Sequence, residues 1–185
     1  MSAFSEYPVL KLMVEWVVVL KRLLLQQKHM PLNLNQPAPD FTLYDTTKKQ
    51  VSLHDFRGKT VVLLFFPFAF SSTCTKELCE LSDSYAFYKG LDAEILGISV
   101  DSLYTNAKFK EVNQISFRLL SDFNKAISAA YDSLIENFAY GYHGVSKRAT
   151  FVIDKNGNLA YSEILASPGD YPDMPKLRQI VASLK

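Results

Sequence analysis

The sequence is poor in the residues that build disulfide frameworks and metal sites. It contains only two cysteines and three histidines in 185 residues. Two cysteines are too few for the disulfide framework of a small secreted domain, and they are typical of a reducing compartment, so we expect the cytoplasm. The histidines (His29, His54 and His143) are far apart in the sequence and form no ligand pattern with the cysteines. Neither a metal nor another cofactor is therefore expected.

An excess of charge of either sign is also missing. Lysine and arginine number 20, aspartate and glutamate number 19, and the net charge is +1. The basic residues are scattered rather than clustered, and the sequence contains no glycine-rich phosphate loop. Nucleic acid is therefore not an expected partner.

No apolar run in the sequence is long enough to cross a membrane, which requires about 20 predominantly apolar residues. Residues 10–25 come closest, but Glu15 and three basic residues interrupt them. Glu15 also breaks the uncharged core that a signal peptide needs. We therefore interpret residues 1–29 as an N-terminal extension, which is either an apolar helix that docks on a partner or the product of a misassigned start. We do not expect it to contact a membrane.

Residues 30–185 contain a regular alternation of apolar segments and are long enough to bury a core. Segments typical of strands alternate with segments of helical periodicity. This pattern predicts one α/β domain with a central mixed β-sheet flanked by helices. The predicted strands are 41–43, 50–53, 60–66, 94–100, 117–120, 149–153 and 159–165, and the predicted helices are 71–89, 102–113, 124–131 and 174–184. Residues 132–147 show little regular pattern and are predicted to form a loop rich in aromatic side chains.

The stretch that begins at Pro67 organises the chain. Strand 60–66 ends there, and Ser71 is a good N-cap residue at the start of helix 71–89. Cys74 is therefore expected in the first turn of that helix. Unpaired N–H groups and the positive end of the helix dipole stabilise a thiolate at this position, so Cys74 should ionise at neutral pH and act as a nucleophile. The alternative is an ordinary buried cysteine.

Pro67, Ser71 and Cys74 match the Pro-x-x-x-Thr/Ser-x-x-Cys signature, and in these residues the chain resembles the peroxiredoxins of the AhpC/TSA superfamily. Residues 65–70 look most like the AhpE-type branch. The Cys-x-x-x-x-Cys spacing of Cys74 and Cys79 is similar to the PrxQ branch, also called bacterioferritin comigratory protein. The resemblance continues through residues 37–43, 98–101, 120–122 and 148–154. It implies a thioredoxin-like fold and a thiol peroxidase that reduces hydrogen peroxide and organic hydroperoxides.

The resemblance also implies roles for the residues before the helix. Cys74 would attack the peroxide and become a sulfenic acid. Pro67 would shield the pocket from water, and the alternative is that it only ends the strand. Ser71 would hydrogen-bond the peroxide, and the alternative is a plain N-cap. These roles require a Cys74 sulfur that is open to solvent and has a cation within reach.

Arg148 matches the distant arginine of the family and would stabilise both the thiolate and the breaking O–O bond. Arg118 is a rival whose sequence context does not match. Glu77, one turn after Cys74, would orient the guanidinium, or it is only a charge on the helix surface. The aromatic residues 132–147 would form a wall of the substrate pocket or a plug over the core.

Cys79 is expected to resolve the sulfenic acid through an intrachain disulfide with Cys74. Residues five apart in an α-helix lie about 8–9 Å from each other between Cα atoms, whereas a disulfide needs roughly 4.4–6.8 Å, so the first turns must unwind. The alternative is that Cys79 is a small core residue and an external thiol resolves the sulfenic acid. The resemblance implies that a thioredoxin-like, glutaredoxin-like or mycoredoxin-like reductant recycles the disulfide, and that the enzyme is a monomer or a homodimer.

Two other functions compete with the peroxidase. A thiol–disulfide oxidoreductase of thioredoxin type needs the closer Cys-x-x-Cys spacing, and here four residues intervene. A non-enzymatic redox sensor or copper-delivery protein would also use two thiols, but a copper site would need a nearby histidine and a tighter spacing of the cysteines.

Overall fold

The computed structural model describes residues 32–185, which form one compact unit. The predicted extension, residues 1–29, lies outside the described residues, as do residues 30 and 31 of the predicted domain. Within residues 32–185, the structure contains no helix whose length and apolarity would let it cross a membrane.

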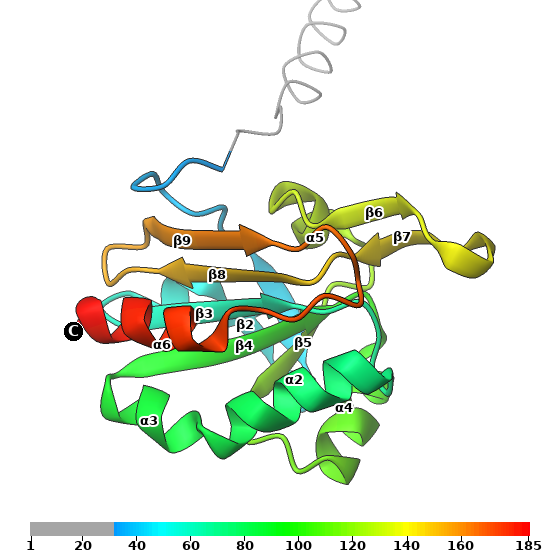
Figure 1. The fold of residues 1–185 in the computed structure, drawn as a ribbon, viewed down its shortest axis with the longest axis horizontal. Helices are drawn as coiled ribbons and strands as arrows, with labels where there is room; N and C mark the ends of the chain where they lie inside the picture. Colours follow the sequence, from blue (N-terminus) through cyan, green and yellow to red (C-terminus); the bar gives the residue numbers. More distant parts are fainter. Residues whose placement is uncertain (1–31) are drawn as a thin grey trace, which may run out of the picture. The chain divides into compact units, whose positions relative to one another are not determined.

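Seven strands build the central sheet of this unit (Figure 1). They are β1 (Thr42–Asp45), β2 (Gln50–Ser52), β3 (Thr60–Phe65), β4 (Ala93–Ser99), β5 (Arg118–Ser121), β8 (Ala149–Ile153) and β9 (Leu159–Ile164). Their order across the sheet is β2-β1-β5-β4-β3-β8-β9. The β3, β4 and β5 strands are parallel, whereas β1, β2, β8 and β9 join through antiparallel pairs, so the sheet is mixed as predicted.

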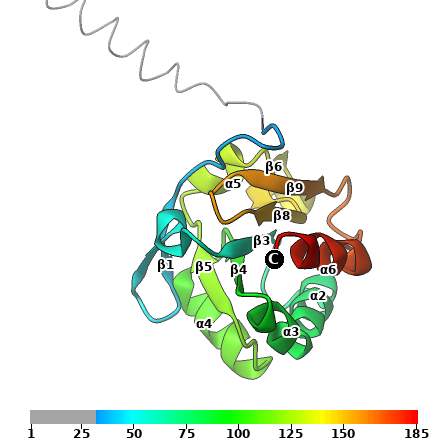
Figure 2. The same ribbon diagram turned by 90° about the vertical axis from the view of Figure 1, so that its left-hand side faces the viewer.

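Helices cover both faces of the sheet, as Figure 2 shows from the side. They are α2 (Ser72–Asp83), α3 (Tyr85–Gly90), α4 (Leu103–Val112), α5 (Ala126–Ala130) and α6 (Met174–Ser183), with short 3-10 segments η1 (Leu53–Phe56) and η2 (Ala139–Gly141). The α/β class with a central mixed sheet flanked by helices is therefore confirmed.

β3 separates two hydrophobic clusters because successive side chains of a strand point to opposite faces. Val62 and Leu64 pack with side chains from α2, α3, α4 and α6. Val61, Leu63 and Phe65 pack on the other face, with side chains from η1 and α5. All residues of β3 are buried, which explains the unbroken apolar run that the sequence shows there.

Two sequence predictions of secondary structure are wrong. The helix expected over 71–89 is two helices, because Ser84 between α2 and α3 takes a bridge-region backbone (φ −92°, ψ 2°) and accepts a hydrogen bond from Arg178. The loop expected over 132–147 contains a hairpin of β6 (Leu134–Asn137) and β7 (His143–Ser146), joined by η2. These strands are too short to show a clear alternation, so the sequence carries little signal for them.

Candidate active site

The loop between β3 and α2, residues 66–71, brings the sequence signature to the edge of the sheet. Pro67 is buried in it, and Phe70 has a left-handed backbone (φ 65°), which non-glycine residues rarely adopt. The Ala69 N–H donates a 2.8 Å hydrogen bond to Asp101 Oδ2. Because β3 and β4 are parallel neighbours, their carboxyl ends lie side by side, and Asp101 follows β4 closely enough to hold this loop.

Ser71 is the N-cap residue of α2, as predicted, with an extended backbone (φ −72°, ψ 147°). Its side chain makes no capping bond. The hydroxyl instead donates a 3.1 Å hydrogen bond to the Phe68 carbonyl within the loop. Cys74 is the third residue of α2 and therefore lies in the first turn, where backbone N–H groups lack intrahelical acceptors.

Arg148 joins Cys74 to Glu77. Its Nη2 donates to the Cys74 sulfur at 3.2 Å and to the Pro168 carbonyl at 3.0 Å, and its Nη1 donates to Glu77 Oε2. Glu77 lies one turn after Cys74 and so shares its helix face. Both side chains of the ion pair are almost completely buried. The structure thus brings three predicted residues into direct contact, and Glu77 is a core partner of Arg148 and not a surface charge.

Burial sets the electrostatics of this pair. It raises the pKa of Glu77 to about 7, although the neighbouring Arg148 acts in the opposite direction. Burial works against the charge of Arg148, but the Glu77 carboxylate and the Cys74 sulfur outweigh it and raise the pKa of the guanidinium. Arg148 is therefore a permanent cation beside the sulfur. Among residues 32–185, its Nε finds no hydrogen-bond partner, nor does Glu77 Oε1.

Cys74 is sealed from solvent in this conformation, with 0% of its surface exposed. The expectation of a sulfur open to solvent is therefore wrong, whereas the expectation of a cation within reach is confirmed. The side chain packs in one cluster with Leu64, Phe66 and Leu78, and Ala69 of the β3–α2 loop lies against that cluster. A peroxide can reach the sulfur only when these surroundings open locally.

Cys79 does not take part in these contacts. Both cysteines are free, and both lie in the intact helix α2. Cys79 is half-buried and lines a groove of about 470 Å³ together with Asp83, Asn113 and Ser116. Burial, together with the Asp83 carboxylate, raises the pKa of the Cys79 thiol. The described conformation is therefore the reduced, wound form of the helix.

Sequence comparison places these residues in a known family. A profile of the AhpC/TSA family matches residues 34–162. The chain belongs to the AhpC/TSA family of peroxiredoxins. It is 39% identical over 132 residues to Peroxiredoxin Bcp of Bacillus subtilis, covering 70% of this chain and 83% of that protein. It is 36% identical over 156 residues to Alkyl hydroperoxide reductase E of Mycobacterium tuberculosis, covering 83% of this chain and 98% of that protein.

The fold agrees with this assignment. The crystal structure of Peroxidoxin BcpB from Mycobacterium tuberculosis matches with a TM-score of 0.73 at 28% identity, covering 83% of this chain and 99% of that one. The mixed sheet with helices on both faces is therefore the thioredoxin-like fold of peroxiredoxins. The resemblance to both the AhpE-like and the Bcp branches is confirmed.

Of the two arginines considered for this peroxiredoxin site, Arg148 is the one that contacts Cys74. Arg118 lies exposed on β5, with its guanidinium 5.8 Å from the centre of the Phe56 ring. Sequence reasoning missed two further contacts, the Asp101 carboxylate and the Pro168 carbonyl. Asp101 directly follows a predicted strand, and this position is a sequence signal by which it can be identified. Pro168 acts through its backbone carbonyl, so its residue type gives no such signal.

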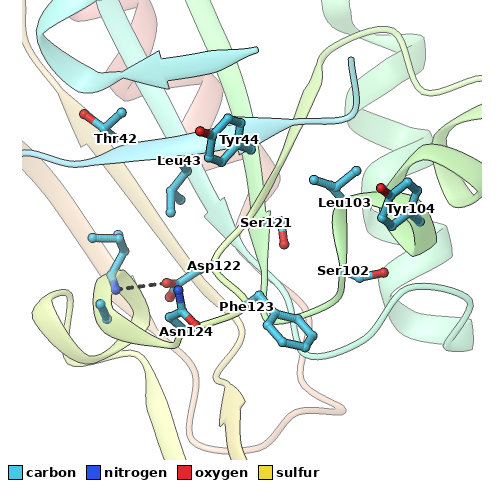
Figure 3. A pocket seen from close by; sticks show the side chains of 12 residues that line it. Thr42, Leu43, Tyr44, Ser102, Leu103, Tyr104, Ser121, Asp122, Phe123 and Asn124 are labelled. Atoms are coloured by element: carbon cyan, nitrogen blue, oxygen red, sulfur yellow. Dashed lines mark hydrogen bonds between the residues drawn. The ribbon is translucent and has the colours of Figure 1, made fainter. Parts of the chain in front are cut away.

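A cavity of about 550 Å³ is lined by other residues than Cys74, Arg148 and Glu77 (Figure 3). Side chains of β1, of the start of α4 and of the segment between β5 and α5 surround it, among them Leu43, Tyr44, Tyr104 and Phe123. It contains none of the predicted site residues. Within residues 32–185, no cluster of three His, Cys, Asp or Glu side chains is arranged to hold a metal ion.

Proposed function

We propose that this peroxiredoxin reduces hydrogen peroxide and alkyl hydroperoxides with Cys74 as the nucleophile. The Cys74 thiolate attacks one peroxide oxygen, and the O–O bond breaks. The electron pair leaves on the second oxygen, which takes a proton to become water or an alcohol. Cys74 becomes a sulfenic acid, a reversible oxidation state. The 3.2 Å contact between Cys74 Sγ and Arg148 Nη2 in the first turn of α2 carries this proposal.

The residues around the Cys74 sulfur have different roles in this reaction. The Arg148 cation stabilises the thiolate and the negative charge that develops on the leaving oxygen. Glu77 fixes the orientation of the guanidinium from the opposite side. Ser71 uses its hydroxyl hydrogen on the Phe68 carbonyl, so its oxygen is an acceptor for the O–H of the peroxide.

Aromatic side chains next to the β3–α2 loop support an organic substrate. Phe68 packs edge-on against Phe138, with ring centres 5.4 Å apart, and against Tyr142 at 6.0 Å. The β6–β7 hairpin is thus an apolar wall beside the loop that must open for the peroxide. Pro67 limits the entry of water from within that loop. The name of the mycobacterial relative, an alkyl hydroperoxide reductase, agrees with this substrate class.

We assign the second half of the cycle to Cys79. Its thiol attacks the Cys74 sulfenic acid, the S–O bond breaks, an S–S bond forms, and water leaves. A thioredoxin-like, glutaredoxin-like or mycoredoxin-like dithiol then reduces this disulfide. Because the cycle needs a reduced Cys79 at its start, it fits the reducing cytoplasm.

The cavity in Figure 3 suggests how two copies could associate. Three large side chains beside it are unusually exposed: Tyr44 at 49%, Tyr104 at 67% and Phe123 at 64%. Exposed apolar surface of this kind is typical of an interaction site. A homodimer would bury it, and Phe123→Ser should then shift the protein toward the monomer in sedimentation velocity.

Stopped-flow oxidation of the reduced protein by hydrogen peroxide and by an alkyl hydroperoxide tests the first step. Cys74→Ser should lose peroxide consumption completely, and Cys79→Ser should keep the first oxidation. Mass mapping after one equivalent of peroxide should show a disulfide between residues 74 and 79 in the wild type. Normal peroxide consumption by Cys74→Ser would overturn the proposal, and a persistent wild-type sulfenate would overturn the role of Cys79.

A further inference from the structure

The segment between β9 and α6, residues 165–173, is fastened to the helix that carries both cysteines. The Tyr171 hydroxyl donates a 2.7 Å hydrogen bond to Glu80 Oε2. The Lys76 ammonium lies 4.9 Å from the centre of the Tyr171 ring. Tyr171 therefore contacts α2 at two residues that flank Cys79 in the sequence. Lys76 lies three residues before Cys79, and Glu80 directly follows it.

The same segment also reaches the active-site arginine. The Pro168 carbonyl accepts a 3.0 Å hydrogen bond from Arg148 Nη2, the nitrogen that contacts Cys74. The segment contains a turn, in which Asp170 Oδ2 accepts a 2.9 Å hydrogen bond from the Ser167 N–H. Residues 165–173 thus hold α2 and Arg148 in one arrangement.

The far end of the segment is anchored in the core. It leads into α6, which lies beside α2 in both ribbon views (Figures 1 and 2). Leu177 and Val181 of α6 belong to the same buried cluster as Leu78 and Leu81 of α2. Tyr171 is therefore attached to a fixed support, and its bond to Glu80 opposes movement of the helix.

Formation of the disulfide requires that movement. Cα atoms five residues apart in a helix are about 8–9 Å from each other, and a disulfide needs roughly 4.4–6.8 Å. Turning Cys79 toward Cys74 unwinds this part of α2 and rotates the adjacent Glu80 away from Tyr171. The Tyr171–Glu80 hydrogen bond therefore opposes an unwinding that extends to Cys79.

We propose that Tyr171 is a positioning residue that keeps α2 wound and thereby sets the fate of the Cys74 sulfenic acid. In the wound form, the sulfenate meets a second peroxide, gains its oxygen as the O–O bond breaks, and becomes a sulfinate while water or an alcohol leaves. In the unwound form, Cys79 displaces water and makes the disulfide. Tyr171 slows the second route and so favours the first. This inference rests on the proposed roles of Cys74 and Cys79.

Tyr171→Phe tests the proposal because it removes only the hydroxyl and keeps the ring that Lys76 contacts. We expect the conversion of sulfenate to disulfide, followed by rapid quench and mass spectrometry, to be about 3- to 10-fold faster. The fraction of sulfinate at a fixed excess of peroxide should fall by a similar factor. The rate of the first oxidation should stay within twofold. Tyr85→Phe is the matched control and should change none of these values, because the Tyr85 hydroxyl donates to Glu94 of β4 and not to α2.

Hydrogen exchange in the reduced protein gives an independent readout. Amides of residues 76–80 should exchange faster in Tyr171→Phe than in the wild type, and those of β3 should not change. Unchanged exchange at 76–80, or an unchanged disulfide rate in a wild type that does make the disulfide, would overturn the role of Tyr171. Absence of the disulfide from the wild type would instead overturn the resolving role of Cys79. The proposed competition between sulfinate and disulfide would then be overturned as well.

Discussion

Arg148 Nη2 lies 3.2 Å from Cys74 Sγ, although 74 residues separate them in the sequence. The sheet explains how they meet. β3 and β8 pair antiparallel, with Phe65 opposite Ala149, so the end of β3 lies beside the start of β8. Cys74 comes soon after β3, in the first turn of α2, and Arg148 directly precedes β8. The antiparallel pairing of β3 with β8 therefore places the nucleophile Cys74 next to the Arg148 cation.

We expect Arg148→Lys to slow oxidation of Cys74 by about 10- to 100-fold, because lysine keeps the charge but loses the fork that contacts Cys74 and Glu77 together. Arg148→Ala alone would leave a buried Glu77 without its partner and strongly destabilise the protein, which would obscure its effect on the rate. The double variant Arg148→Met, Glu77→Gln removes both charges, and its rate should fall about 100- to 1,000-fold. Stopped-flow rates with hydrogen peroxide measure both effects.

Arg118→Met is the control for this series. Arg118 is exposed on β5 and contacts Phe56, so its loss should leave the oxidation rate within twofold of the wild type. A large loss of rate in Arg118→Met, with a normal rate in Arg148→Lys, would exchange the roles of the two arginines.

Ser71→Ala should slow peroxide reduction by about 2- to 10-fold, because it removes one hydrogen bond worth about 0.5–1.5 kcal/mol in the transition state. The stability cost should be below about 1 kcal/mol, since the hydroxyl makes no capping bond to α2. Ser71→Thr keeps the hydroxyl and should restore the rate. Denaturant unfolding and kcat/KM for peroxide, measured on all three proteins, separate the two effects. A stability loss without a rate loss would show that Ser71 only shapes the loop.

The part of the site that is local in sequence is predictable from it. The buried run 60–65, the stop at Pro67 and the N-cap at Ser71 place Cys74 in a first helical turn without any tertiary information. The site residues contributed by distant segments are different. Arg148 is identified only through the family resemblance, because nothing in its local sequence points to Cys74.

Tertiary contacts explain the features that sequence reasoning misses. The break at Ser84 goes with a hydrogen bond from Arg178, which comes from α6. The burial of Cys74 depends on side chains from β3, α2 and the loop between them. Pro168 contributes a backbone carbonyl, a group that every residue carries. These features depend on the folded arrangement and not on a local pattern of residue types.

Glu77 should make the stability of the folded protein depend on pH. Burial raises its pKa from the ordinary 4.5 to about 7. Between these two values the native state binds more protons than the unfolded state, so the contribution of Glu77 to the free energy of unfolding falls as pH rises through this window. From pH 5 to pH 8 the wild type should therefore lose roughly 2–3 kcal/mol of unfolding free energy relative to Glu77→Gln.

Denaturant unfolding at several pH values measures this difference. Both proteins should carry Cys74→Ser, so that oxidation of Cys74 during the measurement does not contribute. The buried Arg148 cation lacks its partner in Glu77→Gln at every pH, which lowers stability by a constant amount and leaves the pH dependence interpretable. Parallel pH profiles of the two proteins would contradict a raised pKa for Glu77.

Asp101 should matter for activity through the backbone of the β3–α2 loop. Its Oδ2 accepts from the Ala69 N–H at 2.8 Å and from the Ser99 hydroxyl at 3.1 Å. Asp101→Ala removes the acceptor that holds the loop, and a misplacement of about 1 Å near a reacting group can cost about 100-fold in rate. We expect a 10- to 100-fold loss in kcat/KM for peroxide, with faster hydrogen exchange at the Ala69 amide.

Asp101→Asn separates the effect of the hydrogen bond to Ala69 from the effect of the negative charge on Asp101. The asparagine side chain has the same shape and keeps one acceptor oxygen for Ala69, so the rate should stay within about threefold of the wild type. Glu111→Ala is a control for the loss of an acidic residue, because Glu111 on α4 forms an exposed ion pair with Lys108 at 2.9 Å, which contributes little. If Asp101→Asn lost as much activity as Asp101→Ala, the negative charge rather than the hydrogen bond to Ala69 would be the feature that the site requires.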